Sequence, residues 1–283
     1  MNIDDIEFIN PILNSSGCWC NTKEQILKLY NSDLGGIVLK TCSLYPNSGN
    51  GEINYYHNLT NDIKLNCKGL PNMGYDYYKS IVLSLNNKPL ILSVTIKNED
   101  ELLIMLVDYD FSVNKKVMVE INMSCPNIQN RIPGYHCKDI INLIKFLRNI
   151  NTKNIVYGIK LPPIFEIEKC MKIAKILNEN NDIIRFIVCS NTIPNGYTRD
   201  IKLSNEYGGI SGKINKYIAL SNVHTFNKLL NNIHIIGCGG IYDTDDIVDY
   251  IDEGASLVQI GSSVYNQEID ELDIDRINEM IIR

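Results

Sequence analysis

Cys125 stands among polar residues at the end of an apolar run, where it could act on a planar polar ligand. Residues 117–121 alternate at the period of two that is typical of a β-strand. A free cysteine at a strand end is usually a core residue, but the neighbouring carboxamides and hydroxyl favour the edge of an active site. The polar group consists of Asn122, Ser124, Cys125 and Asn127.

Two lysines end other apolar runs. Lys40 follows residues 36–39, and Lys160 follows residues 156–159. An ammonium group at the end of a buried strand loses solvation unless an anionic or dipolar partner is present. Side chains that only extend to solvent are the alternative. Together with a thiol between them, the two lysines suit a flavin ring, whose reduced form is an anion.

Glycine-containing pairs follow the last two apolar runs of the chain. They are Gly239-Gly240 and Gly261-Ser262. Glycine lets backbone N–H groups approach an anion closely, and the last two strands of some α/β barrels bind phosphate in this way. A tight turn or a helix cap is the alternative for each pair taken alone. Two pairs on adjacent strands predict a phosphorylated cofactor.

The chain repeats one pattern, in which a short β-branched run is followed by a polar or glycine-rich stop and then by a helix-length segment. The candidate residues all lie at the stops that follow the β-branched runs. Asn98 and Asp243 are expected to cap two of the helices, and residues 166–177 have helical spacing of apolar residues. The expected strands are residues 36–40, 90–95, 117–122, 156–160, 186–190, 208–210, 234–237 and 257–261.

Repeated strand-then-helix units predict parallel strands, which form either an open doubly wound sheet or a closed barrel. The open fold has a G-x-G-x-x-G fingerprint, and this sequence contains only the fragment at residues 237–240. We therefore predict an α/β fold in which residues 1–283 form a single TIM (β/α)8 barrel, with its active site at the C-terminal ends of the strands.

Composition excludes several classes of partner. The formal charge of −6 over 283 residues predicts no binding to nucleic acid or anionic lipid. No apolar stretch is long enough for a membrane span, and acidic residues near Met1 do not suit a signal peptide, so we expect a cytoplasmic protein. Nine cysteines without a C-x-x-C pair predict neither a disulfide framework nor a metal site.

Several strings resemble the dihydroorotate dehydrogenase family, and specifically its soluble class 1A, whose members are FMN enzymes of pyrimidine biosynthesis. The strings 69–74 and 122–127 are specific in combination, and Cys125 differs from the serine of the membrane-bound class 2. The resemblance covers nearly the whole chain. Its matching stretches are residues 10–17, 40–41, 66–74, 120–127, 160–163, 191–192, 208–212, 237–241 and 259–262.

The resemblance implies a reaction in which Cys125 takes a proton from C5 of dihydroorotate while hydride leaves C6 for the flavin N5. It also implies fumarate as the electron acceptor, a homodimer, and a lid formed by residues 128–136. The implied substrate-binding residues are Lys40, Asn66, Gly69, Leu70, Asn122, Asn127, Asn191 and Thr192. The implied FMN-binding residues are Ser16, Lys40, Asn122, Lys160, Ser190, Gly212, Gly239, Gly240, Gly261 and Ser262.

The chain departs from the class 1A pattern at several places, including Lys216-Tyr217 where Lys-Pro is usual and a short loop between Asn191 and Gly208. Lys68 stands where methionine is usual, and residues 49–54 replace a loop that carries an arginine. These departures affect the expected turnover and subunit contacts more than the expected reaction. Two alternatives stay open at this stage: another FMN-dependent pyrimidine oxidoreductase, of the dihydrouracil or dihydrouridine type, and an FMN-binding homologue with weak catalysis.

Overall fold

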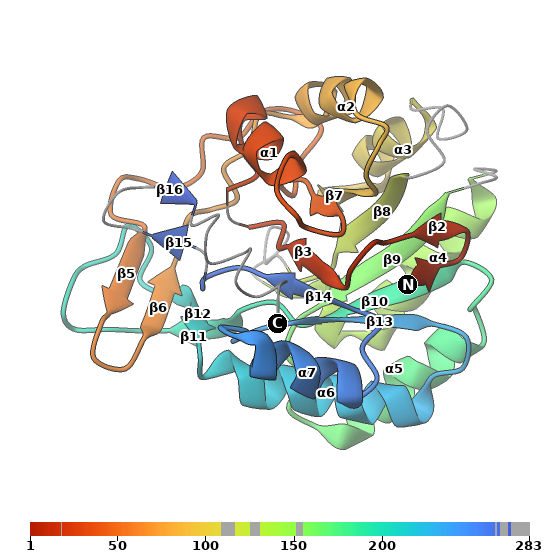
Figure 1. Ribbon diagram of the computed structural model, residues 1–283. Coiled ribbons are helices and arrows are strands. Elements are labelled where there is room, and N and C mark those ends of the chain that lie inside the picture. Colours follow the sequence, from red (N-terminus) through yellow and green to blue (C-terminus); the bar gives the residue numbers. More distant parts are fainter. Residues whose placement is uncertain are drawn as a thin grey trace.

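Eight parallel strands form a barrel in the computed structural model, which describes residues 1–17, 19–108, 117–124, 131–150, 155–263, 265–266 and 271–272 (Figure 1). Their order is β3-β14-β13-β10-β9-β8-β7-β4, and a parallel bridge between Leu13 and Gly36 joins the first strand to the last. The strands are β3 (Ile12–Asn14), β4 (Ile37–Val38), β7 (Leu90–Thr95), β8 (Val117–Asn122), β9 (Val156–Leu161), β10 (Ile184–Cys189), β13 (His234–Cys238) and β14 (Leu257–Ile260).

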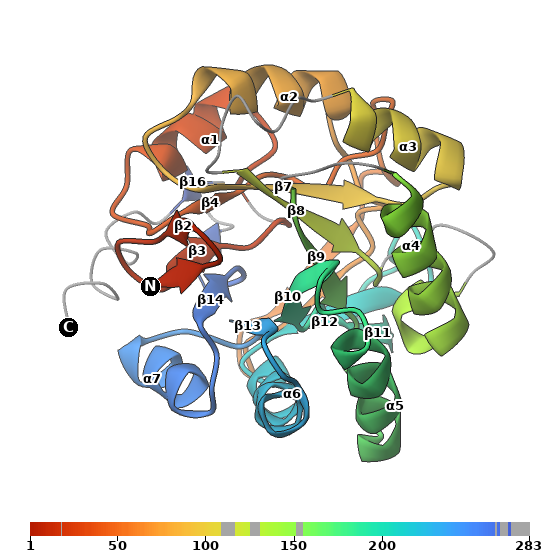
Figure 2. The ribbon, with the colours of Figure 1, turned by 90° about the vertical axis from the view of Figure 1, so that its right-hand side faces the viewer.

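Helices cover the outside of the barrel (Figure 2). The predicted caps are confirmed, because the side chains of Asn98 and Asp243 each accept a hydrogen bond from a backbone N–H three residues later. The helices are α1 (Lys23–Tyr30), α2 (Tyr75–Ser84), α3 (Glu99–Val107), α4 (Cys137–Asn149), α5 (Ile167–Asn178), α6 (Asn215–Leu229) and α7 (Thr244–Asp252), with a short 3-10 helix η1 (Pro133–Tyr135). Within the described ranges, no helix is long and apolar enough to cross a bilayer.

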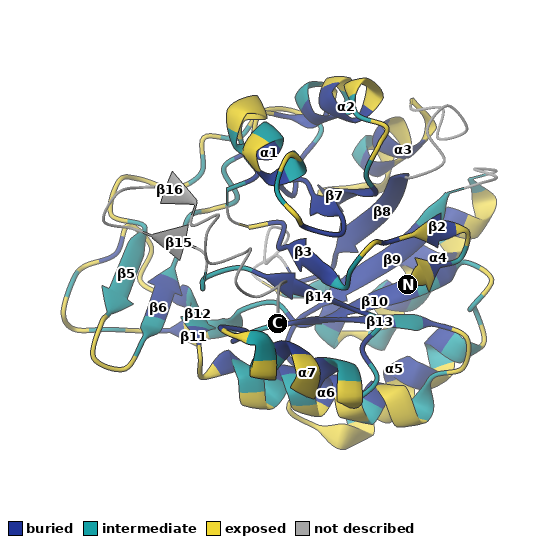
Figure 3. Ribbon diagram, viewed as in Figure 1, coloured by how far each residue is buried: buried dark blue, intermediate teal, exposed yellow. Residues whose placement is uncertain are grey.

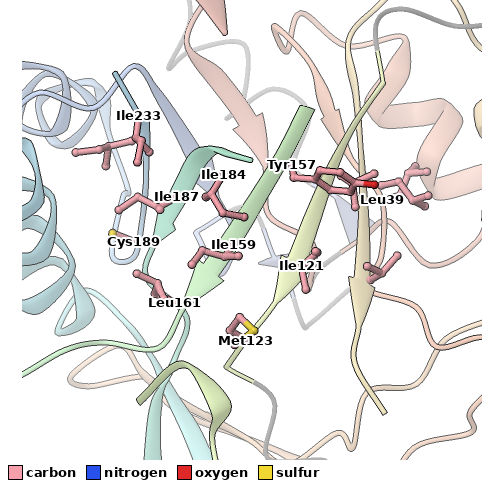
Figure 4. Close-up of a cluster of buried hydrophobic side chains, with 14 of the residues drawn as sticks. Leu39, Ile121, Met123, Tyr157, Ile159, Leu161, Ile184, Ile187, Cys189 and Ile233 are labelled. Carbon is pink, nitrogen blue, oxygen red and sulfur yellow. The ribbon is translucent and has the colours of Figure 1, made fainter. Parts of the chain in front are cut away.

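Strand alternation separates two layers of core. Val117, Val119 and Ile121 of β8 pack with helix residues between the barrel and its covering, whereas Met118 packs inside the barrel. Figure 3 shows that the barrel strands are buried along most of their length. Figure 4 shows part of the outer layer, including Leu39 and Ile121. The predicted orientation of the odd-numbered residues of β8 is therefore confirmed.

A hairpin closes the N-terminal end of the barrel. It pairs β1 (Asn2–Ile3) with β2 (Ile6–Glu7), and its apolar residues join the interior cluster that contains Met118 and Phe186. Asp4 in the hairpin turn receives a bidentate hydrogen bond from Arg185, at the start of β10. The opposite, C-terminal end is therefore the end available for a ligand.

A separate antiparallel sheet lies beyond that C-terminal end (Figure 1, left). Its order is β11 (Ile193–Gly196), β12 (Gly208–Gly212), β6 (Ile63–Asn66) and β5 (Tyr55–Asn58). The prediction of a barrel strand at residues 208–210 is therefore wrong, because this segment pairs antiparallel with β6 and β11. The barrel strand that was missed is β3, which has only three residues. A two-stranded sheet of β15 (Tyr265–Asn266) and β16 (Glu271–Leu272) completes the described elements.

Candidate active site

Inward-facing positions change from apolar to polar near the C-terminal end of the barrel. In β8, Met118 belongs to the apolar interior, and Glu120 and Asn122 follow it at the strand period of two. In β14, Leu257 is likewise followed by Gln259. The barrel therefore carries a polar layer on top of an apolar floor.

One chain of hydrogen bonds crosses this polar layer. The Ser93 hydroxyl lies 2.9 Å from the Thr41 hydroxyl and donates to Glu120 Oε1 at 2.8 Å. Gln259 Nε2 donates to Glu120 Oε2 at 2.8 Å, and Lys160 Nζ donates to Gln259 Oε1 at 2.7 Å. Glu120 is fully buried, and both of its carboxylate oxygens are hydrogen-bonded, as a buried charge requires. Lys160 and Glu120 therefore form a buried ion pair bridged by one carboxamide.

Neighbouring groups keep Lys160 charged. Burial is the largest influence on the pKa of Lys160 and lowers it, but Cys238 and the charge of Glu120 together raise that pKa above its ordinary value. Lys160 is only 3% exposed. A permanent cation below the strand ends can stabilise an anionic ring above it.

A cluster of carboxamides lies on the rim next to Lys160, whose register partner across β8 and β9 is Asn122. Asn122 Oδ1 accepts hydrogen bonds from the backbone N–H and hydroxyl of Ser124, at 3.1 and 2.6 Å. Asn191 Nδ2 donates to the same Ser124 hydroxyl, and Asn191 Oδ1 accepts from the Thr192 N–H at 2.7 Å. The structure thus brings Asn122, Asn191 and Thr192 together, and their role in substrate binding stays a prediction.

The antiparallel sheet adds Asn66 to this rim. β12 pairs Gly209 with Asn66, and Asn66 Nδ2 donates to Gly209 O at 3.4 Å. A Cβ on Gly209 would lie 2.2 Å from Thr192 Oγ1, so glycine is needed where these elements meet. Gly69 and Leu70 both have positive φ angles, and their carbonyls accept hydrogen bonds from Asn47. These contacts fix the shape of the Gly69–Leu70 loop.

Three more predicted residues lie at strand exits. Lys40 is buried just after β4, and the Thr41 N–H donates to Ser16 O at 3.2 Å, which places Ser16 beside it. The Ser190 N–H donates to Cys238 O at 2.7 Å and so links the ends of β10 and β13. These residues surround the polar layer.

The exits of β13 and β14 have the features of a phosphate cradle. A Cβ on Gly240, which has a φ of +63°, would lie 2.5 Å from the Lys216 backbone nitrogen at the first turn of α6. A Cβ on Gly261 would lie 2.7 Å from Ser15 Oγ, and one on Gly212 would meet Asp62 O at 2.0 Å.

Two buried oxygens at this end, Asn215 Oδ1 and Ser263 Oγ, have no hydrogen-bond partner among the described residues. The Ser263 hydroxyl can donate to a phosphate oxygen, and the positive end of the α6 dipole favours an anion. Asn215 Oδ1 is an acceptor and would instead need a donor on the ligand. Gly239 and Ser262 lie in the same turns.

Some predicted residues lie outside the described ranges. They are Cys125, Asn127 and the first part of the expected lid, residues 128–130. The remainder of that segment packs on the exits of β8 and β9. The Gly134 N–H donates to Met123 O, just after β8, at 2.7 Å, and the Tyr135 hydroxyl donates to Pro163 O, just after β9, at 3.0 Å.

Sequence reasoning missed Glu120, Gln259 and Ser93 as parts of the site. A signal was present, because each is a polar residue inside an otherwise apolar strand. A polar side chain in a buried strand is expected only where another group forms a hydrogen bond with it. Among the described residues, no cluster of three or more potential metal ligands occurs.

Comparison with known proteins gives a consistent family. The family model described as dihydroorotate dehydrogenase matches residues 1–281. Proteins named dihydroorotate dehydrogenase (fumarate) from Trypanosoma brucei brucei and Trypanosoma cruzi are 32% and 31% identical to this chain. Each comparison covers 94% of this chain, and 88% and 87% of the respective relatives.

A solved structure has the same fold. The crystal structure of DHODH in complex with ferulenol from Eimeria tenella matches with a TM-score of 0.79 and 18% identity, covering 98% of this chain and 82% of that chain. That likeness supports the barrel architecture, whereas the family model and the trypanosomal relatives cover nearly the whole sequence. The chain therefore belongs to the dihydroorotate dehydrogenase family.

Proposed function

We propose that this protein oxidises dihydroorotate to orotate in pyrimidine biosynthesis, with fumarate as its electron acceptor. The observation that carries the proposal is the rim cluster, in which Asn122 and Asn191 meet at Ser124 beside the buried Lys160. The edge of a pyrimidine ring alternates N–H and C=O groups, and carboxamides supply both matching partners. The names of the trypanosomal relatives support the same substrate and acceptor.

Bound FMN would supply the acceptor for the hydride that leaves the substrate. Lys160 would offset negative charge on the ring, because Cys238 and Glu120 keep it protonated. The glycine exits of β13 and β14 would hold the phosphate through backbone N–H groups. Cys125 would accept the proton from C5, and Lys40 would bind between substrate and ring.

Anaerobic flavin bleaching tests the proposal. The purified protein, reconstituted with FMN, should lose its flavin absorbance when dihydroorotate is added and recover it when fumarate follows. Dihydrouracil is the matched control, because it has the same ring without the carboxylate, and it should bleach the flavin far more slowly. Equal bleaching by dihydrouracil would move the substrate assignment to another reduced pyrimidine, and recovery with a quinone or NAD alone would contradict fumarate.

We also propose a homodimer, which rests on the resemblance to class 1A. The mass of the FMN-loaded protein by light scattering at micromolar concentration tests it. A monomer mass under conditions of full activity would refute the dimer without affecting the proposed reaction.

A further inference from the structure

Lys64 is a buried lysine whose contacts lie next to the phosphate cradle. It belongs to β6 of the antiparallel sheet and is only 4% exposed. Its Nζ donates to the Tyr242 hydroxyl at 2.9 Å and to the Ser262 carbonyl at 2.9 Å, and lies 3.1 Å from Asp62 Oδ1. An ammonium group has three N–H donors, so these three partners use all of them.

The three contacts connect three separate parts of the fold. Tyr242 follows β13 just after Gly239-Gly240, and Ser262 follows β14 just after Gly261. One side chain from the antiparallel sheet therefore ties together the two strand exits that form the cradle.

The contact with Ser262 also orients a backbone donor. In a planar trans peptide the C=O and the next N–H point in opposite directions, so holding Ser262 O toward Lys64 directs the Ser263 N–H away from it. The Ser263 hydroxyl is buried, and it is a donor for which the described residues provide no partner.

Because Asp62 lies beside it, Lys64 holds neighbouring loops in place more than it acts as a free cation. Burial is the largest influence on the pKa of Asp62 and raises it, but hydrogen bonds with Tyr242, His57 and Lys64 outweigh burial and hold that pKa below its ordinary value. The carboxylate therefore stays charged at neutral pH and offsets the charge of Lys64 locally. Lys64 acts through the loops that it holds.

We propose that Lys64 is a positioning residue for the phosphate of the flavin cofactor: it joins the exits of β13 and β14 and fixes the backbone N–H groups that bind that phosphate. The inference rests on the proposed function, since it requires FMN as the ligand. It predicts a contribution specific to the phosphate and absent for a flavin without one.

The test compares FMN with riboflavin, which has the same ring and ribityl chain but no phosphate. Flavin is removed from the full-length protein, and each ligand is titrated back by fluorescence quenching. In Lys64→Met the ratio of FMN affinity to riboflavin affinity should fall by about 10-fold or more. Tyr242→Phe, which keeps the ring and removes one partner oxygen, should lower the ratio in the same direction.

Lys88→Met is the matched control. Lys88 also donates to a backbone carbonyl, that of Ser32 at 2.6 Å, and lies 5.8 Å from the centre of the Tyr30 ring, but it precedes β7 at the other end of the barrel. Its affinity ratio should equal that of the wild type.

Equal loss of both affinities in Lys64→Met would show a general structural role and overturn the inference, as would an unchanged ratio. If Lys64→Met does not fold, an unchanged ratio in Tyr242→Phe overturns it equally. A wild-type protein that binds neither flavin would instead refute the proposed function, and the inference with it.

Discussion

Replacing Lys160 with methionine should destabilise the protein strongly, because it leaves the fully buried Glu120 without its cation. Lys160 is 3% exposed and reaches Glu120 through Gln259, with hydrogen bonds of 2.7 and 2.8 Å. Removing one member of a buried ion pair costs about 3–5 kcal/mol. At roughly 2–4 °C per kcal/mol for a protein of this size, the melting temperature should fall by roughly 6–20 °C.

The orientation of the Gln259 carboxamide provides a second test of the pair formed by Lys160 and Glu120. Its oxygen faces Lys160 and its nitrogen faces Glu120, so the carboxamide suits a cation on one side and an anion on the other. In Glu120→Gln, a Gln259 that turns to accept from the new amide would point its own nitrogen at the Lys160 ammonium. In the double variant Lys160→Met/Glu120→Gln that conflict disappears. The double variant should therefore be less destabilised than the sum of the single variants, by about 0.5–3 kcal/mol.

Chemical denaturation of the flavin-free proteins measures these effects without a contribution from cofactor binding. Lys172→Met is the control, because Lys172 and its partner Glu168 are 63% and 76% exposed and water screens their charges. Its free energy of unfolding should stay close to that of the wild type. If Lys160→Met is as mild as this control, or if the two single variants simply add, the buried pair does not exist as described.

Three further predictions concern the reaction and the thiols. Cys125→Ser should still bind orotate but slow flavin reduction by roughly 100-fold at neutral pH, the scale for losing a general base, and stopped-flow bleaching measures it. Lys40→Met should slow the same step by roughly 100-fold if Lys40 stabilises developing charge, and a wild-type rate would refute that role. Burial raises the pKa of Cys42 to about 12, against the opposing charge of Lys40, and the pKa of Cys170 to about 11. At pH 8 both thiols should therefore resist iodoacetamide while the partly exposed Cys137 reacts, with the reactivity of the two buried thiols rising only as the pH approaches these values; peptide mapping that finds Cys42 labelled first would contradict this.

The barrel could be predicted from the sequence because its signals are local. Alternation in residues 117–121 is visible in the chain itself, and so are the helix caps at Asn98 and Asp243. The segment at residues 208–210 was misassigned because a short glycine-rich run does not reveal which strand will pair with it. Its partners in the structure are β11 and β6, and β6 is far away in the sequence.

The site was predictable only at its rim. Asn122, Asn191 and Lys160 end recognisable strands, so their meeting follows from the barrel itself. The bond between Gln259 and Glu120 joins residues 139 apart, and that between Lys64 and Ser262 spans 198. A polar residue within an apolar strand signals that some partner exists, but the identity of that partner depends on which strands become neighbours.

Lys64 and Lys160 are both buried near the strand exits, but the contacts of Lys64 suit holding a loop and those of Lys160 suit binding a ligand. Lys64 gives all three of its N–H groups to Tyr242, Ser262 and Asp62, and a full carboxylate lies directly beside it. Lys160 donates to Gln259 Oε1 at 2.7 Å and interacts with Cys238, so the described residues do not use all three of its N–H groups. Glu120 carries the opposite charge and reaches Lys160 only through the carboxamide of Gln259. It therefore helps to keep the ammonium group charged without using one of its N–H donors. A buried cation with an N–H group left over is suited to binding an anionic ligand. A buried cation whose N–H groups all have protein partners is suited to fixing the backbone around that ligand.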